Sequence, residues 1–239
     1  STNQTSLDLT APNLEINTIE TIKSTNAGAA TFVLDQGVFT DLQFANAAIT
    51  LQSTGTGGSI QLNGAGTFDF AALTGVTLTN LPNIVAGDVN GAGVADSNVL
   101  LQQTLTGSDT VDLGGGTDSL TLGTGANVAN VINVENIAGN SGTDTVNLGD
   151  NNNTTSIANV ETLNAGAGDD VVTSTTTIVG GAVELKAGND TLNLADGGNI
   201  ASVNNGETIV GGSGNDVISS TTSLFTAGES VDLGGGTGD

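Results

Sequence analysis

The stretch Gly211–Ser219 reads GGSGNDVIS: two glycines, a third glycine two residues later, an aspartate, and then an apolar strand. Glycine adopts positive φ angles without strain, so this spacing predicts a tight turn that leads into a β-strand. The aspartate is notable because the chain sets 25 acidic residues against only two basic ones, Lys23 and Lys186. The interpretation depends on whether this acidic turn recurs, and at what spacing.

The motif recurs along the C-terminal part of the chain. Three segments align with one another: 133–148 (NVENIAGNSGTDTVNL), 159–174 (NVETLNAGAGDDVVTS) and 205–220 (NGETIVGGSGNDVISS). A second set shares all or part of VDLGGGTD: 111–118, 183–190 and 231–239. Successive turn aspartates are 22, 26, 26, 20 and 26 residues apart: Asp96, Asp118, Asp144, Asp170, Asp190 and Asp216. The regular spacing indicates a repeat protein.

Each repeat reads as a strand, a polar turn, a second strand and a glycine turn. Val, Leu and Ile alternate with Thr, Asn and Ser, as expected when one face of a strand is buried. We therefore predict an all-β fold, a parallel β-solenoid (β-roll or β-helix) with coils of about 20–26 residues and glycine-rich turns. Equivalent residues of stacked coils lie roughly 4.8 Å apart. We expect the turn aspartates to form a row along one edge, where their charges repel unless a cation lies between them.

Calcium is the cation that this composition favours. It takes six to eight oxygen ligands from carboxylates and backbone carbonyls, whereas magnesium retains its own water molecules. The chain has no His and no Cys, which leaves only a hard, oxygen-ligated ion. The alternative is that each Gly-x-Asp is only a good turn in which Asp bonds to the local backbone. Five motifs in register and a formal charge of −23 favour calcium.

GGSGNDVIS resembles in full the G-G-x-G-x-D nonapeptide of RTX (repeats-in-toxin) calcium-binding β-rolls. AGAGDDVVT (165–173) and GNSGTDTVN (139–147) each depart from it at one glycine. The resemblance implies calcium as cofactor, with side-chain ligands Asp118, Asp144, Asp170, Asp190 and Asp216. It implies that Asp169 adds a second carboxylate at its turn. It also implies carbonyl-bearing turns at Gly116, Gly142, Gly168, Gly188 and Gly214. Glu135, Glu161 and Glu207 recur in register and are weaker candidates, since each could simply be an outward-facing strand residue.

Composition divides the chain into three parts. Residues 1–86 form a metal-poor β-solenoid segment, residues 87–95 a connecting loop, and residues 96–239 the RTX-like calcium-binding segment. The stretch GDVNGAGVAD (87–96) faintly resembles a helix-loop calcium site, but Ala92 and Val99 stand where ligands are needed. We expect the chain to be a piece of a longer protein.

The bias toward Thr, Asn, Ala and Gly and the near-absence of Lys resemble bacterial S-layer proteins and large adhesins of Gram-negative bacteria. This resemblance implies a structural, calcium-stabilised protein, secreted by a type I route to the bacterial cell surface. The expected partners are other copies of the chain in a lattice or filament, with cell-surface polysaccharide as a further candidate. The alternatives are the stalk of a large secreted RTX adhesin, or the calcium-binding accessory region of a secreted enzyme or toxin.

Several other functions are disfavoured. Nucleic-acid binding needs clustered Lys and Arg, and a membrane span needs a longer apolar run than the chain offers. We expect no enzyme: triads that need His or Cys are absent, and the neighbours Asp169 and Asp170 would point to opposite faces of a strand. Stacked Thr residues in STTT (174–177) and STTS (220–223) leave an ice-binding surface as a minor alternative.

Overall fold

The computed structural model consists of short β-strands and turns, and it contains no helix among the residues it describes. Those residues are 6–8, 21–23, 31–35, 49–52, 59–63, 66–69, 76–79, 83–86, 96–101, 104–107, 109–221 and 228–238. The predicted connecting loop at 87–95 lies outside them, and the predicted domain boundaries stay a prediction. The chain forms two compact units: unit 1 is Ser1–Gln102 with Ser108–Ser119, and unit 2 is Gln103–Gly107 with Leu120–Asp239.

Among its described residues, unit 1 has ten strands, which pair in parallel. They are β1 (Ser6–Asp8), β2 (Thr21–Lys23), β3 (Thr31–Asp35), β4 (Ile49–Gln52), β5 (Ser59–Asn63), β6 (Gly66–Asp69), β7 (Val76–Thr79), β8 (Asn83–Ala86), β9 (Ser97–Leu100) and β10 (Thr110–Asp112). The strand orders are β1-β3-β5-β8-β10, β2-β4-β7 and β6-β9. Phe32 lies opposite Ile60 in the β3–β5 register, and both side chains are buried. Apolar packing therefore contributes to the core of this unit.

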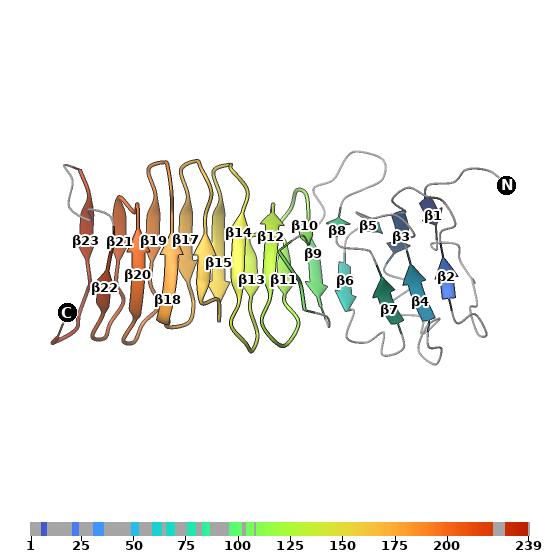
Figure 1. Ribbon diagram of the computed structural model, residues 1–239. Helices are drawn as coiled ribbons and strands as arrows, with labels where there is room; N and C mark the ends of the chain where they lie inside the picture. The colour runs from blue at the N-terminus through green and yellow to red at the C-terminus, as the bar shows by residue number, and fades with distance from the viewer. Residues whose placement is uncertain are drawn as a thin grey trace. The chain divides into compact units, whose positions relative to one another are not determined.

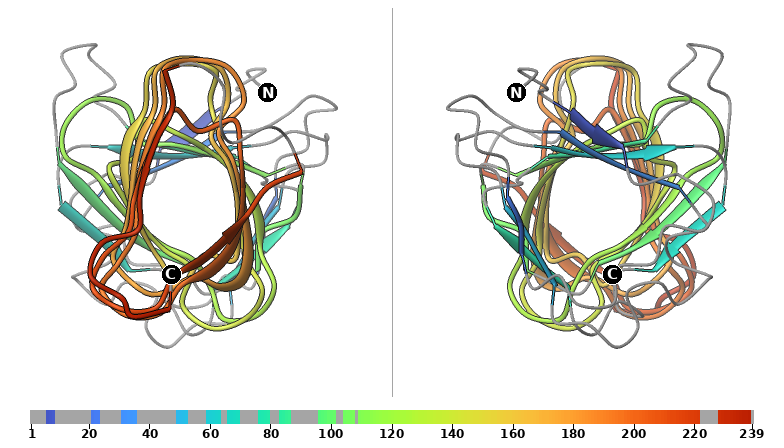
Figure 2. Two further views of the ribbon diagram at one scale, coloured as in Figure 1. Left: turned by 90° about the vertical axis from the view of Figure 1, so that its left-hand side faces the viewer. Right: turned by 90° about the vertical axis from the view of Figure 1, so that its right-hand side faces the viewer.

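Unit 2 is a regular two-sheet solenoid. Its strands are β12 (Val128–Ile132), β13 (Asn136–Ala138), β14 (Thr145–Leu148), β15 (Thr154–Ala158), β16 (Thr162–Asn164), β17 (Val171–Ser174), β18 (Val179–Glu184), β19 (Thr191–Asn193), β20 (Ile200–Asn204), β21 (Thr208–Val210), β22 (Val217–Ser219) and β23 (Ser230–Asp232), with β11 (Ser119–Thr121) at the unit boundary. Even-numbered strands from β12 to β22 pair in order in the first sheet, and odd-numbered strands from β13 to β23 pair in the second. Every coil thus contributes one strand to each sheet (Figure 1). Viewed along the stack, the yellow-to-red coils superimpose as a closed outline (Figure 2).

The coils of unit 2 are shorter than the spacing of the turn aspartates predicts. Thr145 pairs with Thr162, which in turn pairs with Ala182. Hydrogen bonds between equivalent turns of adjacent coils accordingly join residues 17 apart in several coils, as from Asp144 to Glu161, and 20 apart in others, as from Asp170 to Asp190. The longer steps in the aspartate series, such as that from Asp118 to Asp144, cover three strands and therefore one and a half coils. A step of three strands changes sheet, so the predicted single row of aspartates along one edge was wrong.

We define two rims in unit 2 by the residue that immediately precedes each strand. The first rim, before the strands of the first sheet, consists of Asn127, Asp144, Glu161, Ile178, Asn199 and Asp216. The second rim, before the strands of the second sheet, consists of Glu135, Asn153, Asp170, Asp190, Glu207 and Glu229. The predicted aspartates of unit 2 are therefore divided between the two rims.

Inward-facing apolar residues fill the space between the two sheets. In the first sheet the register stacks five buried side chains: Ala129, Val146, Leu163, Val183 and Val203. In the second sheet it stacks Thr155, Val172, Leu192 and Ile209. The period-two alternation in the sequence thus corresponds to a continuous core, as predicted. This core holds the rims in register from one coil to the next.

Candidate metal centre

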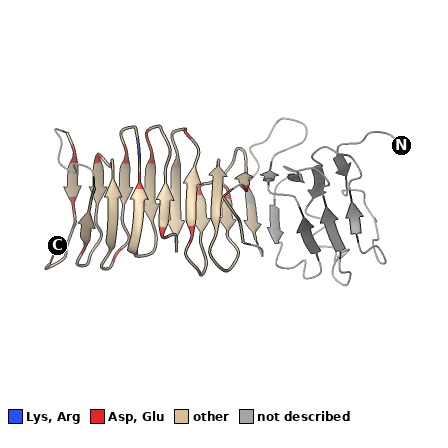
Figure 3. Cartoon of the chain, in the orientation of Figure 1, with Lys and Arg blue, Asp and Glu red and all other residues tan. Residues whose placement is uncertain are grey.

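All five predicted aspartates are buried at the start of a strand. Each side chain is at most 1% exposed: Asp118, Asp144, Asp170, Asp190 and Asp216. Acidic residues gather at the strand ends and turns rather than along the sheets (Figure 3). Aspartate is almost never fully buried without a compensating partner, because desolvation of the charged carboxylate is costly. The hydrogen bonds of these carboxylates therefore need to be accounted for atom by atom.

One carboxylate oxygen of three aspartates has an elaborate set of donors. Oδ1 accepts hydrogen bonds from the backbone N–H and from the side-chain Nδ2 of an asparagine that lies 17 residues earlier, one coil back. The pairs, with the N and Nδ2 distances in turn, are Asn127 with Asp144 (2.9 and 2.7 Å), Asn153 with Asp170 (2.8 and 2.8 Å), and Asn199 with Asp216 (2.7 and 2.8 Å). Each rim aspartate of this kind thus closes the turn of the preceding coil.

Rim carboxylates also accept from the backbone of other rim acids. The N–H of Asp170 donates to Oδ1 of Asp190 at 2.8 Å, and the N–H of Asp190 donates to Oε2 of Glu207 at 2.7 Å. On the first rim, the N–H of Asp144 donates to Oε2 of Glu161 at 2.8 Å. Glu161 and Glu207, the weaker candidates, therefore lie in the same rows as the aspartates.

The second carboxylate oxygen is left without a donor. The Oδ2 atoms of Asp144, Asp170 and Asp190 are buried and accept no hydrogen bond. A buried acceptor without a donor costs about 1–3 kcal/mol, and more when it carries charge. These orphaned oxygens fit a hard cation, which would satisfy them. Among the described residues, no three acidic side chains converge as a ready-made metal cluster, so backbone carbonyls would have to complete any ligand set.

The predicted glycine turns have the positive-φ backbone that the sequence led us to expect. Gly116, Gly142, Gly168, Gly188 and Gly214 all have positive φ, between 123° and 159°. Each lies two residues before a buried aspartate. At Gly168, with φ of 123°, an added Cβ would lie 2.6 Å from the carbonyl carbon and oxygen of Asn151, one coil earlier. Only glycine allows this turn to stack so closely on the previous one.

Asp190 shows the electrostatic cost most clearly. The pKa of Asp190 is raised from 3.8 to about 6, mainly by burial, with a smaller contribution from the negative charges of Asp170, Glu207 and Asp169. The hydrogen bond from the N–H of Asp170 opposes this rise. Like charges held close together in a dry site favour protonation of one of them. A bound cation would favour the ionised form instead.

Other acids are placed differently. Asp169 is exposed, and its Oδ1 accepts from the N–H of Asn189 at 2.8 Å, whereas the carboxylate of Asp170 is buried. Asp96 is also exposed and accepts from the N–H of Thr117 at 2.8 Å, unlike the five buried aspartates. A ligand role for Asp169 stays a prediction.

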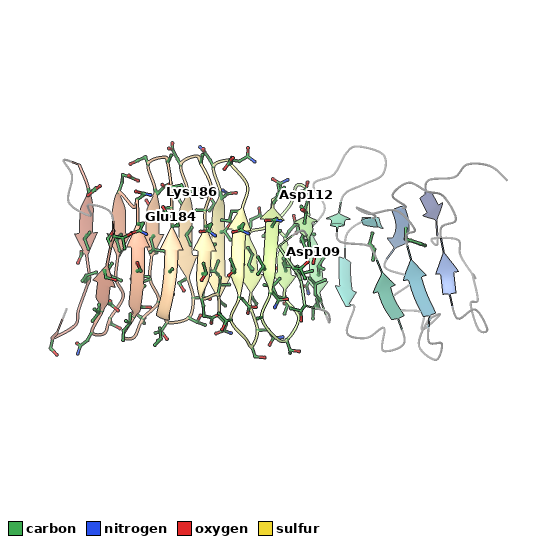
Figure 4. All side chains as sticks on the ribbon, viewed as in Figure 1. Asp109, Asp112, Glu184 and Lys186 are labelled. Atoms are coloured by element: carbon green, nitrogen blue, oxygen red, sulfur yellow. The ribbon has the colours of Figure 1, made fainter. Side chains whose placement is uncertain are left out.

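Two further acids flank strand β10. Asp109 and Asp112 lie at opposite ends of this strand (Figure 4). Asp112 makes a local turn, in which its Oδ1 accepts from the N–H of Gly114 at 3.1 Å. Such Asx turns are the ordinary structural use of aspartate next to glycine. The buried rim aspartates, whose bonds reach between coils, are of another kind.

Sequence reasoning missed the asparagines Asn127, Asn153 and Asn199. They occupy the same rim positions as the aspartates and bond directly to them. The signal was present as a repeated Asn–Asp spacing of 17 residues, which equals the length of one coil. Counting only from aspartate to aspartate concealed it.

Comparison with known proteins agrees with this geometry. A family model described as RTX calcium-binding nonapeptide repeat (4 copies) matches residues 103–129, 158–174 and 203–220. Searches among curated proteins and among solved structures find no match to this chain. Repeats of this family bind calcium and are typical of secreted proteins, and no described helix has the length and apolar character to cross a membrane. The sequence motif, the parallel solenoid and the family match agree that this chain carries RTX-type calcium-binding β-roll repeats.

Proposed function

We propose that the chain is a calcium-stabilised structural region of a secreted bacterial surface protein. One observation carries the proposal: the Oδ2 atoms of Asp144, Asp170 and Asp190 are buried at glycine turns and accept no hydrogen bond. An array of buried carboxylates destabilises a chain with a formal charge of −23. Calcium would reverse that penalty.

The residues that would hold calcium follow from the turns. Asp144, Asp170 and Asp190 supply carboxylates, and the turns at their positive-φ glycines supply backbone carbonyls. Asp118 and Asp216 are buried at the equivalent place in their own turns. Calcium contributes positive charge and tolerant oxygen coordination between adjacent coils. The protein contributes the spacing of those oxygens through the sheet register.

Calcium binding of this kind is coupled to folding. An ion that binds the native state and not the unfolded chain stabilises the fold by mass action. The chain would therefore be weakly folded where calcium is scarce and firmly folded outside the cell.

The direct test is thermal unfolding followed by far-UV circular dichroism. Calcium is titrated into chelator-treated protein, with magnesium as the control. We expect a calcium-dependent gain of β-structure or of Tm that magnesium does not reproduce, and a weaker gain in Asp170→Asn/Asp190→Asn. A spectrum and Tm indifferent to chelator would show that the Gly-x-Asp turns are structural only.

At a finer level, we propose that the region belongs to a self-assembling S-layer subunit at the bacterial cell surface, exported by type I secretion. The acid excess, the Thr- and Asn-rich strand surfaces and the RTX repeats support this role, and no catalytic function is needed to explain them. The partners would be other copies of the chain, with cell-surface polysaccharide as a second candidate. Light scattering and electron microscopy with calcium and with chelator test the assembly, and monomers under both conditions would count against it.

The stalk of a large RTX adhesin is the second candidate, and an accessory region of a secreted enzyme or toxin is the third. Both share the calcium-dependent solenoid. An adhesin stalk would remain monomeric in calcium, so the assembly experiment separates it from an S-layer subunit.

A further inference from the structure

Three rim asparagines have a side-chain amide at the centre of a set of oxygen atoms. Nδ2 of Asn127 donates to the carbonyl oxygens of Gly123 at 2.8 Å and Gly125 at 3.0 Å, and to Oδ1 of Asp144 at 2.7 Å. The two carbonyls belong to the asparagine's own turn, and the carboxylate comes from the next coil. The two N–H bonds of one amide group are therefore shared among two backbone carbonyls and a buried carboxylate.

The other two asparagines repeat the arrangement. Nδ2 of Asn153 donates to the carbonyls of Gly149 at 3.0 Å and Asn151 at 2.8 Å, and to Oδ1 of Asp170 at 2.8 Å. It also lies 3.1 Å from the carbonyl oxygen of Ala165. Nδ2 of Asn199 donates to the carbonyls of Ala195 at 2.9 Å and Gly197 at 3.0 Å, and to Oδ1 of Asp216 at 2.8 Å. The carbonyls lie four and two residues before the asparagine in all three turns.

A turn that ends in aspartate cannot do this. An ionised carboxylate accepts hydrogen bonds and donates none, so it offers nothing to the carbonyls of its own turn. In the turns of Asp144, Asp170 and Asp190, Oδ2 is also left without a donor. In an asparagine turn, the N–H groups of the side-chain amide donate to the carbonyl oxygens. In an aspartate turn, a positively charged group from outside the chain has to take that role.

We propose that the amides of Asn127, Asn153 and Asn199 occupy the position that a calcium ion takes in the aspartate turns. This proposal rests on the proposed function, and it divides the turns of unit 2 into two classes. The asparagine turns are closed without metal, and calcium binds only at turns that end in an acid. Without calcium, the chain accordingly keeps three contacts between adjacent coils, which are held by the amide hydrogen bonds. The turns that depend on calcium can then fold next to these contacts.

The test compares Asn153→Asp with the wild-type chain by isothermal titration of CaCl₂ and by thermal unfolding in chelator. The substitution removes the donor and sets a carboxylate against Asp170 and the carbonyls of Gly149 and Asn151. We expect one additional calcium ion bound per chain, a lower Tm in chelator and a larger rise in Tm with calcium. Asn153→Ala, which removes the amide without adding charge, should lower the Tm in chelator and leave the calcium number unchanged.

Asn193→Asp is the matched control, because it adds the same charge on strand β19 away from the rims. It should change neither the calcium number nor the Tm in chelator by a comparable amount. Asn199→Asp provides a second rim variant if Asn153→Asp does not fold. The proposal is overturned if the wild type binds calcium but neither rim variant binds more. It is also overturned if Asn153→Ala is as stable in chelator as the wild type. A wild type that binds no calcium would instead contradict the proposed function, and a Tm loss in Asn153→Ala would still support the amide's role.

Discussion

The two rims of unit 2 both contain glycine turns, but they differ in charge. Five of the six residues on the second rim are acids, and four of them follow one another: Asp170, Asp190, Glu207 and Glu229. The first rim is interrupted by Ile178 and carries an asparagine on either side of its acidic stretch. Both rims have positive-φ glycines, at Gly142 and Gly168 for example. The turn geometry is thus general, and the demand for a cation depends on which side chain ends the turn.

The comparison shows that the glycine turn and the charge of the residue that ends it vary independently. A positive-φ glycine lies two residues before Asn127 and Asn199, at Gly125 and Gly197, just as one lies two residues before Asp144 and Asp170. The glycine turn therefore forms whether Asn or Asp follows it. The acids then concentrate the electrostatic cost on one rim, where burial and neighbouring charges raise the pKa of Asp190 to about 6. The second rim should therefore respond most strongly to calcium.

The largest expected effect comes from removing consecutive acids on one rim. In calcium, Asp170→Asn/Asp190→Asn should lose about 5 kcal/mol of unfolding free energy, because two sites at a hundredfold excess over Kd contribute about 2.7 kcal/mol each. The first-rim pair Asp144→Asn/Glu161→Gln should lose about half as much, since it contains one buried Oδ2 without a donor rather than two. Urea unfolding in saturating calcium measures both.

The same two variants give the control in chelator. There the second-rim variant should be more stable than the wild type, because it relieves repulsion between buried carboxylates. Equal losses for the two rims in calcium would show that charge density does not decide where calcium acts.

Much of this arrangement could be predicted from the sequence. The parallel solenoid is confirmed, as is the positive φ of the turn glycines Gly142 and Gly168, whereas the burial of Asp144 and Asp170 was not predicted. The spacing between aspartates overestimated the number of residues per coil. Only identical residues were counted, whereas Asn, Asp and Glu all occupy the rim position in different coils. Only when Asn127 is grouped with Asp144 and Glu161 does the shorter period emerge. The 17-residue spacing is present in the sequence, but the equivalence of Asn, Asp and Glu at the rim is established only by the hydrogen bonds between coils.

The likeness of Gly142 on the first rim and Gly168 on the second predicts that substituting either glycine costs about the same. Gly142→Ala and Gly168→Ala should each lose about 3 kcal/mol, because both combine positive φ with overlap against the previous coil. Gly180→Ala is the matched control: its φ is 75°, and an added Cβ would meet nothing within 4 Å. It should lose about 1 kcal/mol, from the backbone conformation alone. Chemical unfolding of the three variants in chelator measures the difference.

A result in which Gly180→Ala costs as much as Gly168→Ala would show that close stacking of the turns adds nothing. A large difference between Gly142→Ala and Gly168→Ala would show that the rims differ in backbone as well as in charge.

The pKa of Asp190 predicts a pH dependence in the metal-free protein. Its carboxyl binds a proton more tightly in the folded state than the ordinary value of 3.8 allows, with a pKa of about 6. Stability is therefore present at low pH and is lost as pH rises through this range. Between about pH 4.5 and about pH 7 the loss should be on the order of 2 kcal/mol. Urea unfolding in chelator across this range should show it.

Asp190→Asn should flatten this part of the profile, whereas Asp144→Asn on the first rim should leave it in place. A wild-type profile that rises from about pH 4.5 to about pH 7, or a slope unchanged in Asp190→Asn, would show that Asp190 is not the group responsible.

The smallest effect is expected at Asp169, the neighbour of the most acidic stretch. Its side chain is exposed and accepts a hydrogen bond from the N–H of Asn189, outside the set of buried carboxylates. An exposed charge is screened by water and contributes little to stability, so Asp169→Asn should change the unfolding free energy by less than about 0.5 kcal/mol. The number of calcium ions in isothermal titration should also stay constant. Loss of one ion would instead assign Asp169 a ligand role and place the cation of this turn on the outer side of the rim, where asparagine amides cannot substitute for it.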